Sequence, residues 1–537
     1  MIINSIPFLI GLVIFHFCVG IKSINPWNLN LISSGINADP YAGHVAWLFF
    51  RDSSWGIPLA DNPRYGLEAA SSLVYSDSIP LIAIPMKFLA QYTRAEVQYF
   101  GIWLLICFLC QSKITWDFIS IYTKSVSVRS LTSILSSTFP VFLWRIQAHF
   151  SLTGQFLIIY ALKLCFHPKQ GRAQRRNWLA LLGVAALVHP YFLAICGFMF
   201  MVRILQEAFG EWQEKKTSSI TALQAFLVVG IVTILIAGYD IKSSNSMVGT
   251  NVEYGTYRFN WLSPLTPNGW SAILRNLNLP LTNFETFSYL GLGVYLICLC
   301  ALISIIVKRR FLIKSMNAKR FTFISIFLMA LFAGTNKIAV GRWELFLPIP
   351  EYFKEISSIF SASARFALPM LYAIFFISII VLIKVKSRIL LLSVLIFATS
   401  IQLVDVSKGI SEIRSRVDNS DYKAIYNGFT DSTWQSLRQN YTIIRVPLAG
   451  RENYGFPQMA LISIRFGFET NSFYFGRVNP EGKERSNYNY NRAVNSYVFE
   501  PETIYVITND ELRRRLESVP KLRNRIIHVD SYYLLAP

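Results

Sequence analysis

Apolar stretches long enough to cross a lipid bilayer recur along the first 404 residues, and they constrain the fold more than any other feature. A transmembrane helix needs about 20 mostly apolar residues. About eleven stretches qualify, several of them short: 2–21, 97–121, 130–145, 150–166, 178–188, 190–205, 220–238, 286–307, 321–334, 366–383 and 389–404. Charged residues make up only 15% of the chain, against roughly 25% in soluble domains. The sequence therefore predicts an α-helical polytopic membrane protein with about eleven transmembrane helices.

Short basic loops between these stretches set the expected orientation, because cytoplasmic loops are enriched in lysine and arginine. Three loops hold several such cations and no acid: 167–177, 308–320 and 384–388. If these loops face the cytoplasm, the N-terminus is also cytoplasmic. Three long loops then face outside: 22–78, 239–285 and 335–364. The net charge of +20 thus reflects loop orientation, which argues against a nucleic-acid partner.

Two apolar segments contain prolines that affect the number of spans. The segment 78–90 is short and contains Pro80 and Pro85, so we expect a re-entrant or membrane-edge helix there. In the segment 178–205, Pro190 follows His189 in the middle of the apolar run. Because proline interrupts helical hydrogen bonding, we expect two short helices that meet near His189 on the outer side.

Residues 405–537 follow the last apolar stretch and form the second predicted domain. The run "DSTWQSLRQN" has a helical pattern and "YTIIRVPL" alternates as a strand does. Near the end, "TIYVITN", "DELRRRLESV" and "RIIHVDSYYLLAP" predict a strand, a helix capped by Asp510 and a strand. We therefore predict a transmembrane domain over 1–404 and a soluble α/β domain over 405–537 on the outer side.

The first outer loop contains the strongest candidate site. Asp39 precedes Pro40, an order typical of a helix start, with aspartate at the cap and proline in the first turn. His44, Trp47 and Arg51 follow at spacings of three and four, which place them on one helical face. Aromatic rings can stack on a sugar and arginine pairs with phosphate. The face therefore suits a sugar phosphate, and Asp39 can cap the helix and also serve as a carboxylate base.

Four more charged residues of the outer loops join the candidate site. Glu68 is a supporting or capping group. Arg258, Arg342 and Arg365 lie on the side where cations are less common, so anionic headgroups or a lipid-linked phosphate would be their partner. Arg365, at the start of a span, is equally typical of an interface anchor.

Several motifs resemble an uncharacterised family of large bacterial inner-membrane proteins, and that family is similar to the GT-C glycosyltransferases. The motifs cover most of the chain: the run from Asp39 through His44 and Trp47 to Arg51, "NPRYGLE", "YSDSIPL", "YRFNWLSPLTP", "FETFSYLGLG", "FSASARFALP", "NSFYFGR" and "TIYVIT". GT-C enzymes are polytopic and use polyprenyl-phosphate-linked sugars. They share an acidic residue in the first outer loop, just after the first span, and Asp39 matches that residue.

The resemblance implies a GT-C-like fold and an inverting hexosyl- or pentosyltransferase in the bacterial inner membrane, with its C-terminal domain in the periplasm. It also implies its partners: membrane lipid, a polyprenyl-phosphate-linked sugar donor, a cell-envelope glycan acceptor such as O-antigen, and the synthase and flippase that supply the donor. Asp39 would be the general base, and Arg258, Arg342 or Arg365 would stabilise the departing lipid phosphate.

Metal and cofactor expectations follow from the same loop. Many GT-C enzymes carry two nearby acids there, whereas Asn37 and Ala38 precede Asp39 in this chain. A divalent metal is therefore not favoured, and no cofactor is expected. The pair Cys107 and Cys110 lacks the second pair that a zinc site needs.

Two other functions stay open at this point. One is a polysaccharide polymerase or ligase that acts on lipid-linked oligosaccharide. The other is a flippase or transporter of lipid-linked glycan, which would keep ionisable residues near the membrane midplane. The predicted spans contain few such residues: His16, Lys87, Lys113, Asp117 and Lys163.

Overall fold

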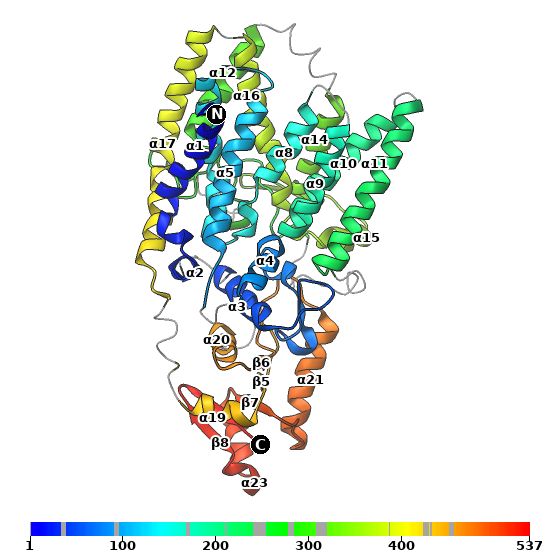
Figure 1. The fold of residues 1–537 in the computed structure, drawn as a ribbon, viewed down its shortest axis with the longest axis vertical. Helices are drawn as coiled ribbons and strands as arrows, with labels where there is room; N and C mark the ends of the chain where they lie inside the picture. Colours follow the sequence, from blue (N-terminus) through cyan, green and yellow to red (C-terminus); the bar gives the residue numbers. More distant parts are fainter. Residues whose placement is uncertain are drawn as a thin grey trace. The chain divides into compact units, whose positions relative to one another are not determined.

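The computed structural model describes residues 2–33, 39–90, 96–167, 172–209, 212–239, 254–277, 284–307, 319–385, 387–422, 429, 432–450 and 456–537. The chain divides into two compact units, and each is considered by itself (Figure 1). The helical unit comprises Met1–Asn28, Tyr99–Val232 and Val252–Asp418, and the mixed unit comprises Leu29–Gln98, Thr233–Asn251 and Asn419–Pro537. The first outer loop thus belongs to the same unit as the C-terminal segment.

The helical unit consists mainly of apolar α-helices. Its helices are α1 (Ile2–Cys18), α5 (Phe100–Ile119), α6 (Val126–Ser137), α7 (Pro140–Trp144), α8 (Phe156–Phe166), α9 (Arg172–Val188), α10 (Pro190–Ala208), α11 (Trp212–Ile231), α12 (Leu292–Val307), α14 (Arg320–Gly334), α15 (Glu351–Ser358), α16 (Leu368–Val385) and α17 (Arg388–Asn419). Short 3₁₀ turns precede two of the spans: η8 (Phe284–Thr286) and η9 (Ser363–Ala367). In the described part of this unit, β3 (Lys337–Val340) and β4 (Trp343–Phe346) form a hairpin.

Six helices in the described part are long and apolar enough to cross a membrane by length and composition. They are Phe100–Ile119, Val126–Gln147, Pro190–Ala208, Ser218–Ile236, Ser363–Lys384 and Arg388–Asn419. Five shorter apolar helices accompany them: Ile3–Cys18, Pro80–Ala90, Ser151–Phe166, Leu292–Val307 and Arg320–Gly334. These helices fit a membrane protein, while the count of eleven crossings and the topology stay predictions. Of the three basic loops, 308–320 lies mostly outside the described residues, as do 168–171 and 386 in the other two.

Prolines decide where several of these helices break. The predicted break near His189 is confirmed, because α9 ends at Val188 and α10 begins at Pro190. The ring Nδ1 of His189 caps α10 by accepting the backbone N–H of Tyr191 at 3.2 Å. A second break was not predicted: the stretch 130–145 divides into α6 and α7 at Pro140.

Close helix packing in this unit depends on small residues. Helix α1 packs against α5, and a Cβ added to Gly11 would lie 2.7 Å from the carbonyl oxygen of Phe108. Glycine therefore lets the two backbones approach, as at many helix contacts in membranes.

The mixed unit combines the first outer loop with the C-terminal sheet. From the loop come α2 (Asn30–Ser33), α3 (Asp39–Asp52), β1 (Asp61–Asn62), η2 (Leu67–Ala69), β2 (Ser71–Ser72), η3 (Leu73–Tyr75) and α4 (Pro80–Ala90). From the C-terminal segment come α19 (Thr433–Asn440), β5 (Ile443–Arg445), α20 (Phe456–Phe466), β6 (Glu469–Thr470), α21 (Pro480–Ser496), β7 (Thr503–Ile507), α22 (Asp510–Glu517), α23 (Pro520–Arg523), β8 (Ile526–Val529) and β9 (Tyr532–Leu535).

The five C-terminal strands form one sheet in the order β6-β5-β7-β9-β8. Strand β5 pairs in parallel with β6 and β7, whereas β9 is antiparallel to β7 and β8. Apolar side chains cover the sheet in two clusters, one around Trp434 and Ile504 and the other around Tyr505 and Leu516. The sheet with its helices spans most of the region predicted to be α/β.

Three local expectations differ from the structure. The helix α22 is capped by Asn509, whose Oδ1 accepts the N–H of Leu512 at 2.7 Å, and Asp510 is its first residue. The final segment forms two strands rather than one, because the chain turns at Asp530 with a positive φ of 51°. Helix α17 runs through the predicted boundary at residue 404 and ends at Asn419.

Candidate functional site

Helix α3 presents the predicted base at its first residue. Asp39 begins the helix and is 9% exposed, and the residues that follow it up to Phe50 are all buried. A carboxylate in the first turn is favoured by the partial positive charge of the helix N-terminus. The structure therefore keeps an acidic group at the start of a buried helix. Asn37 and Ala38 lie outside the described residues.

The predicted polar face of α3 contacts another part of the same unit. His44 is fully buried, with Nε2 3.0 Å from Oε1 of Glu96, and the same oxygen accepts the hydroxyl of Tyr422 at 2.6 Å. The Nε1–H of Trp47 donates to the carbonyl of Val97 at 2.9 Å. Two of the three face residues thus contact the adjacent residues Glu96 and Val97, while their contact with a substrate stays a prediction.

Arg51 and Glu68 also have partners within the mixed unit. Arg51 donates two hydrogen bonds to the carboxylate of Asp52, at 2.7 and 3.0 Å. Glu68 accepts two hydrogen bonds from the guanidinium of Arg445, at 2.7 and 3.1 Å, and a third from Asn489 at 2.7 Å. Glu68 therefore links η2 to β5 and α21.

The charge of Arg445 governs the ionisation of Glu68. Burial raises the pKa of this carboxyl, but the hydrogen bonds and charge of Arg445 outweigh burial and lower the pKa to about 2. Glu500 adds a second carboxylate to the same guanidinium, 2.7 Å from its Nε. Glu68 is thus ionised and held in a structural ion-pair network, which fits the supporting role expected for it.

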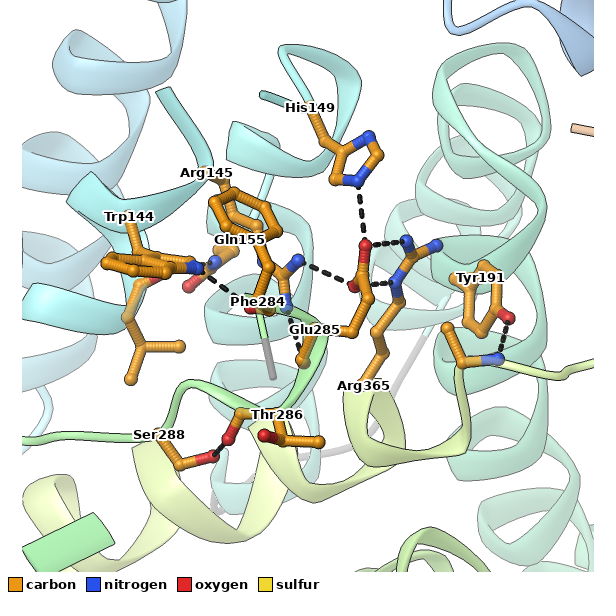
Figure 2. A network of polar contacts seen from close by, with 12 residues as sticks. Trp144, Arg145, His149, Gln155, Tyr191, Phe284, Glu285, Thr286, Ser288 and Arg365 are labelled. Atoms are coloured by element: carbon orange, nitrogen blue, oxygen red, sulfur yellow. Dashed lines mark hydrogen bonds and ion pairs between the residues drawn. The ribbon is translucent and has the colours of Figure 1, made fainter. Parts of the chain in front are cut away.

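The helical unit contains a compact charged cluster around Glu285 (Figure 2). Arg365 contacts both carboxylate oxygens, with Nε 3.0 Å from Oε2 and Nη2 2.9 Å from Oε1. Arg145 donates to Oε2 at 2.8 Å and to the backbone carbonyl of Glu285 at 3.2 Å. His149 places Nε2 2.7 Å from Oε1, and because an ionised carboxylate only accepts, this nitrogen carries the proton.

Burial and an aromatic ring fix the arginines of this cluster. Arg145 is 2% exposed, and the guanidinium of Arg365 lies 4.5 Å from the ring centre of Tyr191. The hydroxyl of Tyr191 accepts the N–H of Ala362 at 2.9 Å, which fixes the ring beside Arg365. These groups come from elements far apart in the chain, namely η4 (Arg145–Gln147), η8, η9 and α10.

Among the described side chains, the cluster has more positive than negative charges. Among the contacts described, two arginines face one carboxylate, which leaves a net charge of +1 before His149 is counted. Burial raises the pKa of Glu285, but Arg365 and Arg145 outweigh it and hold the pKa well below its usual range. The arginines are charged as well. Within the described contacts, two buried guanidinium groups thus converge on a single carboxylate.

The other two predicted arginines lie elsewhere in the helical unit. Arg258 donates to the carbonyl of Gly255 at 2.7 Å and to Glu344 of β4 at 2.7 Å. Arg342 lies at the turn of the β3–β4 hairpin, where its side chain is exposed. The structure therefore brings Arg365 into a charged cluster, while Arg258 and Arg342 belong to the hairpin region.

The predicted site residues thus fall into two sets. Asp39, His44, Trp47, Arg51 and Glu68 belong to the mixed unit, and Arg258, Arg342 and Arg365 belong to the helical unit. Within the described ranges, no three histidine, cysteine, aspartate or glutamate side chains group as metal ligands would.

Sequence reasoning missed Glu285, the centre of the cluster. Its contacts lie 80 to 140 residues away, so no helical spacing connects them. A signal was present, because Glu285 is an acid immediately before a predicted span. Ionisable residues at such positions need a partner inside the protein.

Comparisons with known proteins give a family and a distant structural likeness. A family described as "Domain of unknown function (DUF6311)" matches residues 8–407, and the "DUF6311 C-terminal domain" matches residues 433–537. No curated protein matches the chain.

Among solved structures, the chain is similar to the oligosaccharyltransferase AglB of the archaeon Archaeoglobus fulgidus, in complex with an inhibitory peptide and a dolichol-phosphate. The identity is 12% and the TM-score 0.42, over 87% of this chain and 64% of AglB. A second Archaeoglobus fulgidus oligosaccharyltransferase structure, tethered to an acceptor peptide containing the NVT sequon, gives 12% identity and a TM-score of 0.41, over 87% and 63%. The chain thus spans just under two thirds of these proteins. At this level of likeness, function has to be argued from the chain's own residues.

Proposed function

The chain belongs to the DUF6311 family, and on the basis of its charged sites we propose that it is an inverting glycosyltransferase of the GT-C type. Its donor would be a sugar linked to polyprenyl phosphate, and its acceptor a cell-envelope glycan such as O-antigen. The reaction would take place at the outer face of the bacterial inner membrane, with residues 405–537 in the periplasm.

The observation that carries this proposal is the convergence of buried positively charged side chains on Glu285. Two arginines and a histidine converge on one carboxylate, at the end of one apolar helix and the start of another. A phosphate ester provides acceptor oxygens and negative charge, both of which an arginine pair binds well. Arg365 and Arg145 would therefore hold the donor phosphate and stabilise it as it leaves.

Asp39 is the proposed general base. The acceptor hydroxyl would give its proton to the Asp39 carboxylate while its oxygen forms a bond to the anomeric carbon of the sugar. The bond between that carbon and the phosphate oxygen breaks, and the electron pair leaves with the lipid phosphate. A single displacement of this kind inverts the anomeric centre. His44, Trp47 and Arg51 would position Asp39 through the packing of α3, and Glu68 would brace the loop.

The other predicted groups take part less directly. Arg258 and Arg342 would attract the lipid phosphate to the outer surface, because anionic headgroups favour nearby cations. A synthase would load the sugar onto the polyprenyl phosphate, and a flippase would deliver it to the outer leaflet. A divalent metal is not part of this proposal.

The distribution of charged residues supports transfer over transport. Lys113 and Asp117 pair at 2.7 Å within the last two turns of α5, and Lys163 lies in the last turn of α8. Arg145 and Arg365 likewise lie near the ends of their apolar helices. A transporter of lipid-linked glycan would need such groups near the midplane. A polymerase or ligase remains the second candidate, since its diphosphate donor would fit the same positive cluster.

Analysis of the cell-surface glycan tests the overall activity. Mass spectrometry should show that cells without this protein lack a single hexose, pentose or deoxysugar on their surface glycan. Loss of whole repeat units instead would favour the polymerase or ligase, and an unchanged glycan would contradict all of these functions.

The role of Asp39 is tested in the same cells. We expect Asp39→Asn to insert normally but to lower transfer by about 10²–10⁴-fold, the usual contribution of a general base. Asp52→Asn provides the comparison on the same helix: it removes only the ion-pair partner of Arg51 at the other end of α3, so it should lower transfer far less than Asp39→Asn. Full transfer by Asp39→Asn would rule out Asp39 as the base.

A further inference from the structure

The β3–β4 hairpin and helix α15 carry an exposed apolar surface. All four residues of β4 are exposed, and Trp343, Leu345 and Phe346 are 83%, 59% and 57% exposed. We define the hairpin surface as Trp343, Leu345, Phe346, Leu347, Tyr352 and Phe353. Several exposed apolar side chains close together in the chain are typical of an interaction site.

The hairpin is held firmly along its inner edge. The N–H of Trp261 donates to the carbonyl of Ala339 at 2.9 Å. Asn260 forms two hydrogen bonds with the backbone of Gly341 at the turn, one to the carbonyl and one from the N–H, both at 2.9 Å. The ion pair of Arg258 with Glu344 adds a third attachment. The exposed side chains therefore belong to an ordered element with a fixed orientation.

We propose that the hairpin surface inserts into the headgroup region of the phospholipid bilayer. Successive side chains of a strand point to opposite faces, so Trp343 and Leu345 lie on one face of β4 and Phe346 on the other. A protein partner would dock against one face. A fluid lipid phase surrounds both faces, which matches a strand whose every residue is exposed.

The backbone of β4 limits the depth of insertion. Within the described strands, β4 pairs with β3 alone, so its outer edge has no strand partner. Unpaired backbone groups cost several kcal/mol each in the hydrocarbon core. Tryptophan and tyrosine favour the interface, where one part of the ring is apolar and the other hydrated. The hairpin surface therefore lies at headgroup depth.

The charge of Arg342 and the position of the hairpin between two apolar helices also support phospholipid as the binding partner. Arg342 is exposed at the hairpin turn, where its guanidinium can reach lipid phosphates while its stem lies along the apolar surface. The segment begins where the apolar helix α14 ends at Gly334, and the next candidate span begins at Ser363. Both ends of the segment are thus joined to apolar helices. This inference does not rest on the glycosyltransferase proposal.

Depth-dependent quenching of a fluorescent label tests the inference. The full chain carrying Trp343→Cys is labelled with a polarity-sensitive thiol probe and reconstituted in nanodiscs. Separate samples contain lipids with a nitroxide near the headgroup or near the end of the acyl chain. Leu345→Cys provides a second probe on the same face, and the unsubstituted chain measures background from the seven native cysteines.

Two exposed positions calibrate the measurement. Phe226 is 75% exposed on a candidate span. A label on Phe226→Cys should be quenched most by the deep nitroxide. Val498 is 67% exposed in the mixed unit, and a label on Val498→Cys should be quenched by neither nitroxide lipid. At Trp343 we expect the shallow nitroxide to remove about half of the emission or more, and the deep one much less, because interfacial elements insert only about 5–10 Å.

Two results would overturn the proposal. One is quenching at Trp343 as weak as at Val498. The other is self-quenching of the Trp343 label that grows with the number of chains per nanodisc, which would indicate that a second copy covers the surface.

Discussion

Two arginine–carboxylate clusters in this protein share the same chemistry and differ in the sign of their excess charge. In the mixed unit, Arg445 faces the carboxylates of Glu68 and Glu500, which leaves a net charge of −1. In the helical unit, Glu285 faces Arg145 and Arg365, which leaves a net charge of +1 among the described contacts. Both clusters join segments that are distant in the chain.

The sign of the net charge suggests a structural role for the Arg445 cluster and, under the proposed function, a binding role for the Glu285 cluster. The Arg445 cluster has carboxylates and an amide around one cation, so an anionic ligand would be repelled there. The described part of the Glu285 cluster has two buried guanidinium groups around one carboxylate, and under the proposed function it would attract a phosphate. Removal of the central group should therefore have different consequences in the two clusters.

Glu285→Gln should have the largest effect on stability. It leaves the buried guanidinium of Arg145 beside Arg365 without a counter-charge, and loss of one partner of a buried ion pair costs about 3–5 kcal/mol. We expect a lower melting temperature of the purified protein in detergent and a lower yield. Added polyprenyl phosphate should restore part of the loss if the arginines bind it. An unchanged melting temperature would contradict the assignment of Glu285 as the centre of the cluster.

Glu68→Gln should have a smaller effect, because Arg445 keeps its ion pair with Glu500. We expect a loss of about 1–3 kcal/mol, the range for an unsatisfied buried polar group. The measurement is the same melting temperature, and polyprenyl phosphate should give no rescue. Rescue equal to that of Glu285→Gln would remove the distinction between the two clusters.

Acid pH should weaken the Arg445 cluster over a defined range. Because the pKa of Glu68 is lowered to about 2 in the folded chain, its stabilisation is complete above the ordinary carboxyl pKa of about 4.3 and is lost as the pH falls toward 2. We expect the melting temperature to fall more steeply between these values in the unsubstituted chain than in Glu68→Gln. Equal slopes would show that other carboxyl groups govern acid stability.

The sequence predicted features that depend on neighbouring residues. The helix break at Pro190 and the shared contacts of His44 and Trp47 follow from steric restriction and helical spacing, which operate over a few residues. Such patterns locate a helix start to within about one residue: Asp510 was the predicted cap of α22, and Asn509 is the observed cap. The turn at Asp530 was missed because a single residue with positive φ divides an otherwise continuous strand pattern.

The clusters could not be predicted because their partners are distant in the chain. Glu68 and Arg445 are 377 residues apart, and Glu285 and Arg145 are 140 apart. Sequence patterns identified Arg365 and Glu68 as unusual charged residues and left their partners unknown. The grouping of the first outer loop with the C-terminal segment in one unit was hidden for the same reason.

A third ion pair provides the smallest expected effect and a reference for the two clusters. Arg258 pairs with Glu344 on the exposed strand β4, where the glutamate side chain is 39% exposed. Ion pairs with an exposed partner contribute about 0–1 kcal/mol, because water already stabilises the exposed charge. The guanidinium of Arg258, whose side chain is 11% exposed, keeps its hydrogen bond to the carbonyl of Gly255. Glu344→Gln should therefore change the melting temperature little, and the hydrogen bonds of Asn260 should still hold the hairpin. A loss as large as that of Glu68→Gln would show that β4 is covered more deeply than its exposure indicates. In that case the pair, like the two clusters, would count as a buried one.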